Sequence, residues 1–441
     1  MDLIIWELLK SYLPIFLFFN SSFSDFMNIL VVGVNTRPIV NSAKRLGHTV
    51  YSASHYNPMD LNADVKKYIV DDNKHGYFHD AYDEKKLLNI AEHLIDNYNI
   101  DHIFTASGIF ENINSKTPDW NVVGNTPKKI KTMSNKYIVS KKLENLGYDI
   151  PATYIAYNSK QIGKYLYTLN SIIIKTVYGS GGTGVYSLSL GDINCDINDA
   201  IDGLNIQYPV IVQEKIFSDS YSASFVGSNF LCFNKQLINN NSYVGNITPY
   251  NINNIDNVNN YIDLFEEIIS SFDLSGMNGI DFMIKDNVPV IIEINPRILG
   301  TFETIELSSN KNLIDLIIKY QGVNKRSSDK LHKIVRKNNQ YVKKILFAEQ
   351  KLISYIGVSN LQSQFCNANI TKPVLQSCKF SKGKFGDIRI CDIPKYGATI
   401  EKNEPLATII INKASAINDT TINNNISKMV VNYEYDKRRY I

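Results

Sequence analysis

The chain has 441 residues, of which 44% are hydrophobic and 20% are charged, and its formal net charge is +3. These values are ordinary for a soluble globular protein of two or three domains, and the small charge gives no sign of a nucleic-acid or membrane-surface partner. The five cysteines lie far apart without a Cys-x-x-Cys pair. This spacing argues against a disulfide framework or a zinc knuckle and favours a cytoplasmic location.

The first 26 residues differ in character from the rest. They are mostly apolar, but Glu7, Lys10 and Pro14 interrupt the run, and the stretch is short for a membrane span, which needs about 20 apolar residues. Met27 then opens a natural first strand, Met-Asn-Ile-Leu-Val-Val-Gly-Val. We interpret Met27 as the functional start and residues 1–26 as an over-called or disordered leader, with a signal anchor as the alternative.

Residues 27–130 alternate between strand-like and helix-like patterns. Such alternation predicts a Rossmann-like parallel sheet with crossover helices. Ligands of these sheets lie beyond the carboxyl ends of the strands, so residues 35–37 and 107–111 fall in candidate binding loops. The predicted strands are 29–34, 48–52 and 102–105, and the predicted helices are 38–46 and 85–98.

The middle of the chain mixes helices with hairpins. Ser134 suits the N-cap of a helix that ends just before Gly147. Two strands flank a glycine-rich loop, and two more form a hairpin around Asp286-Asn287. The predicted helices are 134–147, 261–272 and 312–320, and the predicted strands are 171–177, 185–190, 279–285 and 288–295.

The strand that begins at Val288 carries the most informative side chains. The end of this apolar run has polar residues at alternate positions, namely Glu293, Asn295 and Arg297. Alternate side chains of a strand point to the same side. A carboxylate and an amide oxygen suit a hard cation such as Mg²⁺, and a guanidinium suits a phosphate or a carboxylate. This pattern is typical of a place where a nucleoside triphosphate is handled.

Asp281 lies twelve residues before Glu293. A hairpin loop with an odd number of residues would set the two carboxylates opposite each other, and a two-residue loop would set them on opposite faces. Facing carboxylates repel one another, so a cation between them is physically reasonable. Under the first condition Asp281, Glu293 and Asn295 would form a metal site.

Gly179 to Gly184 fits G-x-G-x-x-G, but the residues that follow look like a strand rather than a helix. A dinucleotide fingerprint therefore fails, and a P-loop fails because Val185 stands where its lysine should be. A glycine-rich hairpin that offers backbone N–H groups to phosphates remains, with a flexible turn as the alternative. Lys175 precedes the loop and Lys136 lies in a first helical turn, so both are placed to meet phosphate oxygens.

Residues 211–216 form a short apolar strand that runs into polar residues. The backbone near its end could meet the edge of an adenine ring, although the same residues could simply form an edge strand. The candidate adenine-binding residues are Gln213, Glu214, Lys215 and Ile216.

In their order and spacing, these segments resemble the ATP-grasp superfamily, and most closely predicted ATP-dependent carboligases related to biotin carboxylase. The resemblance covers about residues 27–320, with further support from 300–303, 312–313 and 392–406. It implies ATP as cofactor with Mg²⁺, or alternatively Mn²⁺, held by Asp281, Glu293 and Asn295. It assigns catalysis to Arg297 and Lys175. The implied nucleotide contacts are Lys136, Lys175, Gly179, Ser180, Gly181, Gly182, Thr183, Gly184, Gln213, Glu214, Lys215 and Ile216.

The resemblance also implies a fold and an activity. The fold is mixed α/β and α+β, with a Rossmann-like domain at 27–130, an ATP-grasp domain at 131–325 with its lid at about 150–215, and a β-rich segment at 326–441. The activity is a ligase that activates a small carboxylate as an acyl phosphate for attack by an amine, forming a C–N bond, or by another nucleophile forming C–S or C–C. A bicarbonate-activating carboxylase and a non-catalytic ATP-binding regulator are the alternatives. A homo-oligomer is left open, and no Met-Lys-Met biotin-attachment sequence follows.

Overall fold

The computed structural model describes most of the chain between residues 26 and 413. Nearly all of the predicted leader and four residues of the glycine-rich loop, Ser180, Gly181, Gly182 and Thr183, lie outside the described residues. Among the residues that are described, no helix is long and apolar enough to cross a membrane. The described ranges are 26–78, 81–179, 184–193, 195–252, 258–321, 335, 339–354 and 388–413.

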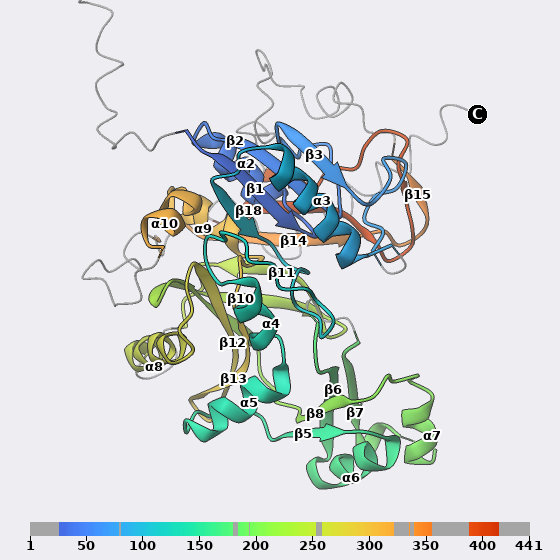
Figure 1. The fold of residues 1–441 in the computed structure, drawn as a ribbon. Helices are drawn as coiled ribbons and strands as arrows, with labels where there is room; N and C mark the ends of the chain where they lie inside the picture. Colours follow the sequence, from blue (N-terminus) through green and yellow to red (C-terminus); the bar gives the residue numbers. More distant parts are fainter. Residues whose placement is uncertain are drawn as a thin grey trace, which may run out of the picture.

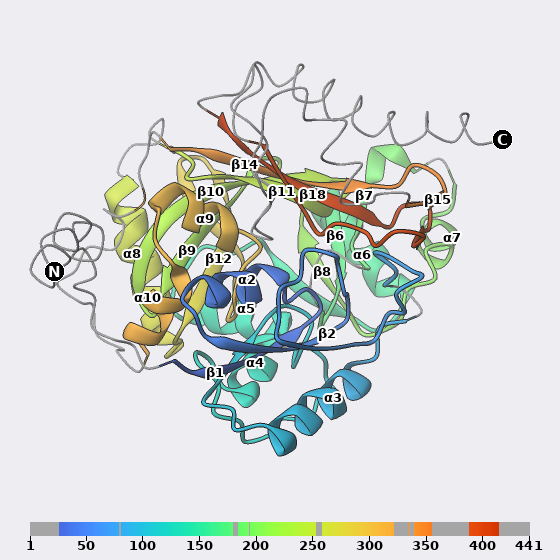
Figure 2. The same cartoon turned by 90° about the horizontal axis from the view of Figure 1, so that it is seen from above.

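The first sheet is parallel and is covered by a helix on each face, as Figure 2 shows. Its strand order is β3-β2-β1-β4. Apolar side chains of β1 alternate between two cores: Ile29 and Val31 pack with α2, and Leu30 and Val32 pack with α3. The elements are β1 (Asn28–Gly33), α2 (Arg37–Arg45), β2 (Thr49–Ser54), β3 (Val65–Tyr68), α3 (Glu84–Asn97) and β4 (His102–Thr105).

The predicted parallel sheet is therefore confirmed, with one strand added. Strands β1, β2 and β4 lie within two residues of their predicted bounds. Strand β3 was missed because its central residues are Lys66 and Lys67, which are exposed and break the apolar pattern of a strand. It pairs in parallel with β2 at the edge of the sheet, where charged side chains are common.

The predicted helix at 134–147 is shorter than expected, and its N-cap prediction is wrong. Asn135 caps α5 (Lys136–Asn145) by accepting from the N–H of Ile138 at 3.1 Å. Ser134 instead ends a separate helix, α4 (Pro127–Met133), and donates to the carbonyl of Ile130 at 2.8 Å. Both residue types cap helices, so the sequence pattern could not choose between adjacent candidates.

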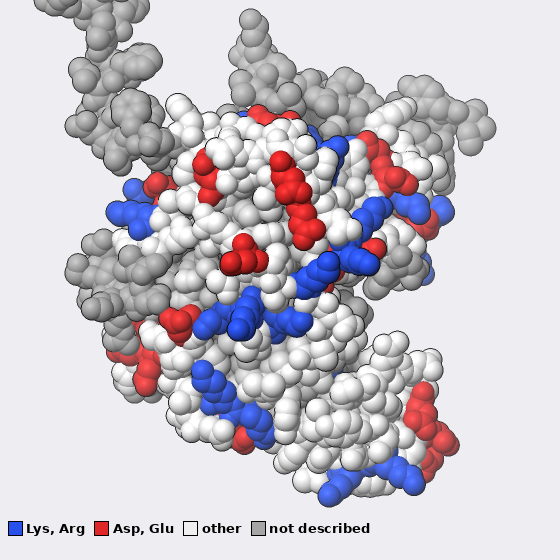
Figure 3. Space-filling view, in the orientation of Figure 1, with Lys and Arg blue, Asp and Glu red and all other residues white. Residues whose placement is uncertain are grey.

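A small lid follows, at the lower right of Figure 1. Its sheet has the order β5-β8-β6-β7, and every neighbouring pair is antiparallel. The space-filling view shows a deep indentation between this lid and the main body (Figure 3). The elements are β5 (Thr153–Ala156), α6 (Ser159–Leu169), β6 (Ser171–Thr176), β7 (Tyr186–Ser189), the short 3₁₀ helix Leu190–Asp192, α7 (Ile197–Asp202) and β8 (Val210–Glu214).

An eight-stranded sheet forms the centre, in the order β13-β12-β9-β10-β11-β14-β18-β16. The last three strands come from the carboxyl-terminal segment, so this segment extends the central sheet. The two-stranded β15–β17 sheet also comes from it. The elements are β9 (Ser220–Val226), β10 (Asn229–Asn239), β11 (Ser242–Thr248), β12 (Met277–Lys285), β13 (Val288–Asn295), β14 (Tyr341–Phe347), β15 (Leu352–Ile353), β16 (Ile388–Cys391), β17 (Thr399–Ile400) and β18 (Pro405–Asn412).

The two faces of this sheet differ in chemistry. One face packs Phe225, Phe233 and Phe282 against the apolar side of α8 (Val258–Ser271). The other carries buried amides and hydroxyls, which form hydrogen bonds with each other and with α9 (Phe302–Ser309). Helix α10 (Leu313–Lys319) joins the core beneath α2. The polar face is therefore the one that can supply groups for chemistry.

A buried ionic cluster joins the amino-terminal sheet to the rest of the chain. Arg37, only 3% exposed, donates to both carboxylate oxygens of Glu303 at 2.8 and 2.6 Å. Its Nε donates to Asp392 at 2.6 Å and lies 3.4 Å from Asp60. Burial opposes the charge, but Asp392 and Glu303 outweigh it and hold the pKa of Arg37 well above its usual value. Arg37 therefore serves to join domains, although its loop was a candidate binding loop.

We predict that Arg37→Met lowers the free energy of unfolding by about 3–5 kcal/mol, because it leaves buried carboxylates without their counter-charge. Lys351→Met is the matched control, since Lys351 and Glu401 form an exposed pair, 65% and 44% exposed. Its effect should stay within about 1 kcal/mol. Chemical denaturation followed by circular dichroism measures both, and equal effects of the two substitutions would contradict the structural role.

Candidate active site

Asp281 and Glu293 face each other across β12 and β13. The turn between the strands has two residues, Asp286 and Asn287, both left-handed with φ of 51° and 61°. Regular pairing from such a turn would set Asp281 opposite Ile292. The register instead shifts by one residue beside Asp281, so that Ile292 has no partner and Glu293 lies opposite Asp281.

The pairing was predicted only under a condition that this turn does not meet, and yet the pairing is present. An odd-numbered loop was the sequence condition, and the loop is even. A β-bulge supplies the extra residue within β13 instead. Bulges of this kind occur next to active sites, where they redirect a side chain.

The Asp281 carboxylate is held by two amides. One oxygen accepts from Gln236 at 2.9 Å and the other from Asn295 at 3.0 Å. Burial, reinforced by the charge of Glu293, raises the pKa of Asp281 to about 6. Two facing carboxylates in this half-buried position favour either a proton or a cation between them.

Two lysines supply positive charge from different elements. Lys136, the first residue of α5, forms an ion pair with Glu293. Lys175, near the end of β6 in the lid, is 7% exposed, and burial together with the charge of Lys136 lowers its pKa to about 8. Burial raises the pKa of Glu293, but Lys136 and Lys175 outweigh this, and its pKa lies below the usual value.

The arrangement could hold a magnesium ion that takes only some of its ligands from the protein. In the described part of the chain, no three or more His, Cys, Asp or Glu side chains gather in a metal-binding cluster. The hairpin offers two carboxylates, Asp281 and Glu293, beside the amide of Asn295. Magnesium in phosphate-handling sites commonly uses one or two carboxylates and takes its other ligands from phosphates and water.

Arg297 follows β13 and lies beside these groups. Its Nε donates to Glu111, which comes from the amino-terminal domain. Burial opposes the guanidinium charge, but Glu111 outweighs it and raises the pKa of Arg297, with smaller contributions from Glu293 and Asp281. The site therefore combines residues of all three regions: the amino-terminal domain, the lid and the central sheet.

The start of the glycine-rich loop contacts the start of α5. The N–H of Lys136 donates to the carbonyl of Val177 at 3.0 Å, and Asn135 donates to the Tyr178 hydroxyl at 2.9 Å. Gly179 and Gly184 both have positive φ, of 119° and 71°. Strands β6 and β7 pair antiparallel on either side, so the predicted glycine-rich hairpin is confirmed in its described part.

The predicted adenine segment lies at the end of β8, between β5 and β6, so it is not an edge strand. Gln213 is buried and donates to the Thr153 hydroxyl at 2.8 Å, and Glu214 pairs with Lys285 at 2.7 Å. The backbone N–H groups of Glu214 and Lys215 already donate to carbonyls within the lid. An adenine edge would therefore have to meet the peptide of Ile216 or carbonyl oxygens of this segment.

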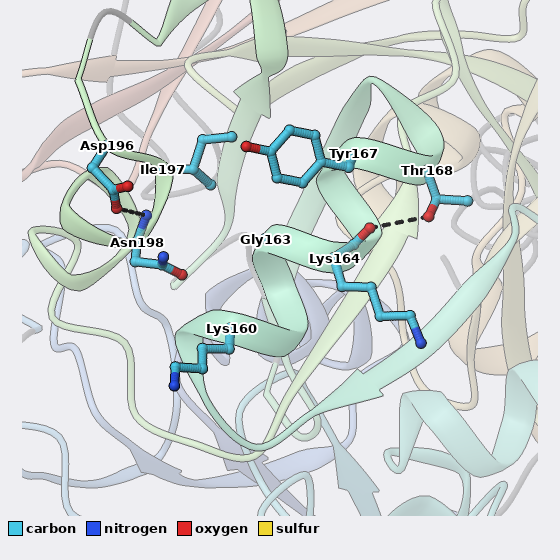
Figure 4. Close-up of a pocket in the computed structure, with 8 residues that line it drawn as sticks. All are labelled: Lys160, Gly163, Lys164, Tyr167, Thr168, Asp196, Ile197 and Asn198. Atoms are coloured by element: carbon cyan, nitrogen blue, oxygen red, sulfur yellow. Dashed lines mark hydrogen bonds between the residues drawn. The ribbon is translucent and has the colours of Figure 1, made fainter.

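A separate pocket opens on the lid, between α6 and α7 (Figure 4). Its volume is about 550 Å³. Lys160 and Lys164 line one side, and Asp196 on the other side caps α7 by accepting from the N–H of Asn198 at 2.8 Å. It contains none of the residues that surround Glu293, so it belongs to the surface of the lid rather than to the candidate site.

Two contributors were not predicted as site residues. Gln236 lies on β10, a long strand whose alternating polar residues Asn234 and Gln236 were the available signal. Glu111 lay at the end of a candidate loop, but its partner Arg297 is 186 positions away. The structure brings the predicted residues Lys136, Lys175, Asp281, Glu293, Asn295 and Arg297 together, whereas Gln213, Glu214 and Lys215 engage in contacts within or beside the lid.

The chain resembles one domain family and two individual proteins. A family model described as ATP-grasp domain matches residues 133–301. A protein of Methanocaldococcus jannaschii described as uncharacterized is 43% identical over 414 residues, covering 94% of each chain. The tyramine–L-glutamate ligase of the same organism is 26% identical over 242 residues, which is 54% of this chain and 68% of that one.

Solved structures show the same fold at low identity. An ADP complex of N5-carboxyaminoimidazole ribonucleotide synthetase has a TM-score of 0.61 and 13% identity, covering 88% of this chain and 94% of the other. The biotin carboxylase domain of the Hydrogenobacter thermophilus 2-oxoglutarate carboxylase has a TM-score of 0.60 and 14% identity, covering 88% and 86%. The predicted fold class is confirmed: residues 133–301 match the ATP-grasp domain, and the chain belongs to the same family as the 43% identical protein of Methanocaldococcus jannaschii.

Proposed function

We propose that the protein is an ATP- and Mg²⁺-dependent ligase that activates a carboxylate as an acyl phosphate and joins it to an amine. The observation that carries this proposal is the meeting of Lys136 and Lys175 with the facing carboxylates Asp281 and Glu293. Positive groups for phosphates and oxygen ligands for a cation thus lie within one half-buried site.

The lysines would bind the phosphates from two sides. Lys136 approaches from α5 and Lys175 from the lid, so closing the lid over ATP would bring both ammonium groups to the phosphate chain. Lys175 is buried, and burial together with the charge of Lys136 lowers its pKa, so its ammonium group would gain from an anionic partner. Phosphate oxygens would supply that partner, which supports a nucleotide at this point.

Asp281, Glu293 and Asn295 would hold Mg²⁺ or Mn²⁺. Burial and the charge of Glu293 both raise the pKa of Asp281, which supports this assignment because a cation between the two carboxylates would offset both effects. When bound, the metal would neutralise charge on the phosphates during transfer. Lys136 would exchange part of its contact with Glu293 for the nucleotide.

The proposed reaction has two steps. A carboxylate oxygen of the acid attacks the γ-phosphorus, the bond to the β-phosphate oxygen breaks, and ADP leaves. An amine nitrogen attacks the carbonyl carbon of the acyl phosphate, phosphate departs with the bonding electrons, and the nitrogen loses a proton. Arg297 and Lys175 would stabilise the negative charge that develops on the transferred group.

The amine is favoured as nucleophile by one relative. The tyramine–L-glutamate ligase, 26% identical over 54% of this chain, joins an amine to an amino acid according to its name. Bicarbonate could replace the organic acid in the same first step, since it too presents a carboxylate oxygen to the γ-phosphorus. A regulator that binds ATP without turnover would not need Lys136, Lys175, Asp281 and Glu293 together.

We predict that Glu293→Gln lowers Mg²⁺-dependent ATP turnover about 100-fold or more, because the amide cannot supply the second negative charge of the metal site. Asp286→Asn is the matched control: it makes the same change in the exposed turn of the same hairpin, at a left-handed position that asparagine tolerates. Coupled ADP-release assays at several Mg²⁺ concentrations measure both. Normal turnover in Glu293→Gln would overturn the metal assignment.

A phosphate-release screen against pooled small acids and amines tests the proposed activity itself. We expect release that requires an acid and an amine together, and that Glu293→Gln abolishes. Bicarbonate-dependent ADP release without an amine would favour the carboxylase alternative. Tight ATP binding without release under any combination would favour the regulatory protein and contradict the proposal.

A further inference from the structure

A charged contact reaches the candidate site from the amino-terminal domain. The Nε of Arg297 donates to one carboxylate oxygen of Glu111, and the two side chains are 12% and 7% exposed. Within the described residues, the terminal nitrogens of Arg297 make long contacts of 3.4 Å, to the Ile298 carbonyl and the Asn295 amide oxygen. Glu111 therefore holds the guanidinium by its inner nitrogen and leaves the outer two weakly engaged.

The carboxylate of Glu111 is itself fixed by its own loop. Its second oxygen accepts from the N–H of Gly108 at 2.9 Å. Gly108 has φ of +85°, and a Cβ there would lie 2.4 Å from the Val34 side chain, so only glycine fits. The loop packs directly against the end of β1, which fixes where Glu111 points.

The residue before Glu111 adopts a conformation that bulky residues rarely take. Phe110 has φ of +63° and is completely buried. Glu84, the first residue of α3, accepts from the N–H of Phe110 at 2.6 Å and from the Ser115 hydroxyl at 2.7 Å. Such a strained conformation persists only where surrounding contacts determine it. The structure thus maintains a costly loop shape that presents Glu111 to Arg297.

Arg297 has competing partners. The charges of Glu293 and Asp281 also act on its guanidinium. Without Glu111, attraction toward these two carboxylates would draw Arg297 onto the proposed metal site, where it would neutralise the groups that a cation needs. Glu111 holds the guanidinium back and keeps its outer nitrogens directed at an incoming anion.

We propose that Glu111 is a positioning residue that orients Arg297 toward the phosphoryl group in transfer, and so couples the amino-terminal loop 107–111 to the chemistry of the central sheet. This inference rests on the proposed function. It predicts that loss of Glu111 weakens binding of a phosphoryl-transfer mimic more than it weakens binding of the nucleotide alone.

Orthovanadate with Mg·ADP is the probe, because vanadate can occupy the position of a transferring phosphoryl group and needs no knowledge of the acid or the amine. Isothermal titration calorimetry would measure Mg·ADP first and vanadate on the Mg·ADP complex second. We expect Glu111→Ala to weaken vanadate about tenfold or more, as for the loss of one hydrogen bond to a charged group, with Mg·ADP affinity unchanged. Glu111→Gln, which can still accept from Nε, should restore part of the affinity.

Two further variants separate positioning from general damage. Asp119→Asn changes an exposed acid in the same segment and should leave vanadate affinity unchanged. In an Arg297→Met background, Glu111→Ala should cause no additional loss, because the two residues act as one unit. Additive losses, or unchanged vanadate affinity in Glu111→Ala, would overturn the positioning role. A wild-type protein that binds Mg·ADP but never vanadate would instead overturn the proposed phosphoryl transfer.

Discussion

The facing pair of carboxylates on the central hairpin is the constraint on which the rest of the site depends. Asp281 and Glu293 lie opposite each other in a half-buried position, where two negative charges are costly. Every charged neighbour offsets this cost: Lys136 by an ion pair, and Lys175 and Arg297 by longer-range attraction. The proposed function requires that one of these internal partners be exchanged for a metal and a nucleotide.

The two faces of the central sheet differ in chemistry, so the charged groups lie on the opposite side from the aromatic core. The face toward α8 is a continuous aromatic and aliphatic core that includes Phe225, Phe265 and Phe282. The opposite face carries hydroxyls and amides that satisfy one another, such as Asn234 with Ser222 and Ser224. One face is therefore apolar throughout, while the other combines apolar residues such as Val226 and Met277 with polar groups that form hydrogen bonds with one another.

Much of this arrangement could be read from local patterns. The alternation of Glu293, Asn295 and Arg297 on an apolar strand predicted a shared face, and the glycine-rich stretch between two strands predicted a hairpin. Strands β1 and β4 were predicted from buried apolar runs. These features depend on neighbours within a few residues, which is the range over which sequence periodicity is informative.

Other features depend on partners far away in the chain. The bulge at Ile292 carries no glycine or turn residue that would reveal it, and so the register of Asp281 could be stated only as a condition. The sequence placed Arg37 in a candidate ligand-binding loop, whereas in the structure it forms ion pairs with Glu303 and Asp392. The role of Glu111 is apparent only from its ion pair with Arg297. Single-sequence patterns contain no information on such long-range pairs.

The central claim is that the γ-phosphoryl group of ATP passes to a carboxylate at the site around Glu293. The most direct measurement uses an acid substrate whose carboxylate oxygens are labelled with ¹⁸O, turned over with Mg·ATP and an amine, followed by mass spectrometry of the released phosphate. Transfer through an acyl phosphate predicts that each phosphate carries one labelled oxygen from the acid. Product formation with unlabelled phosphate would contradict the account.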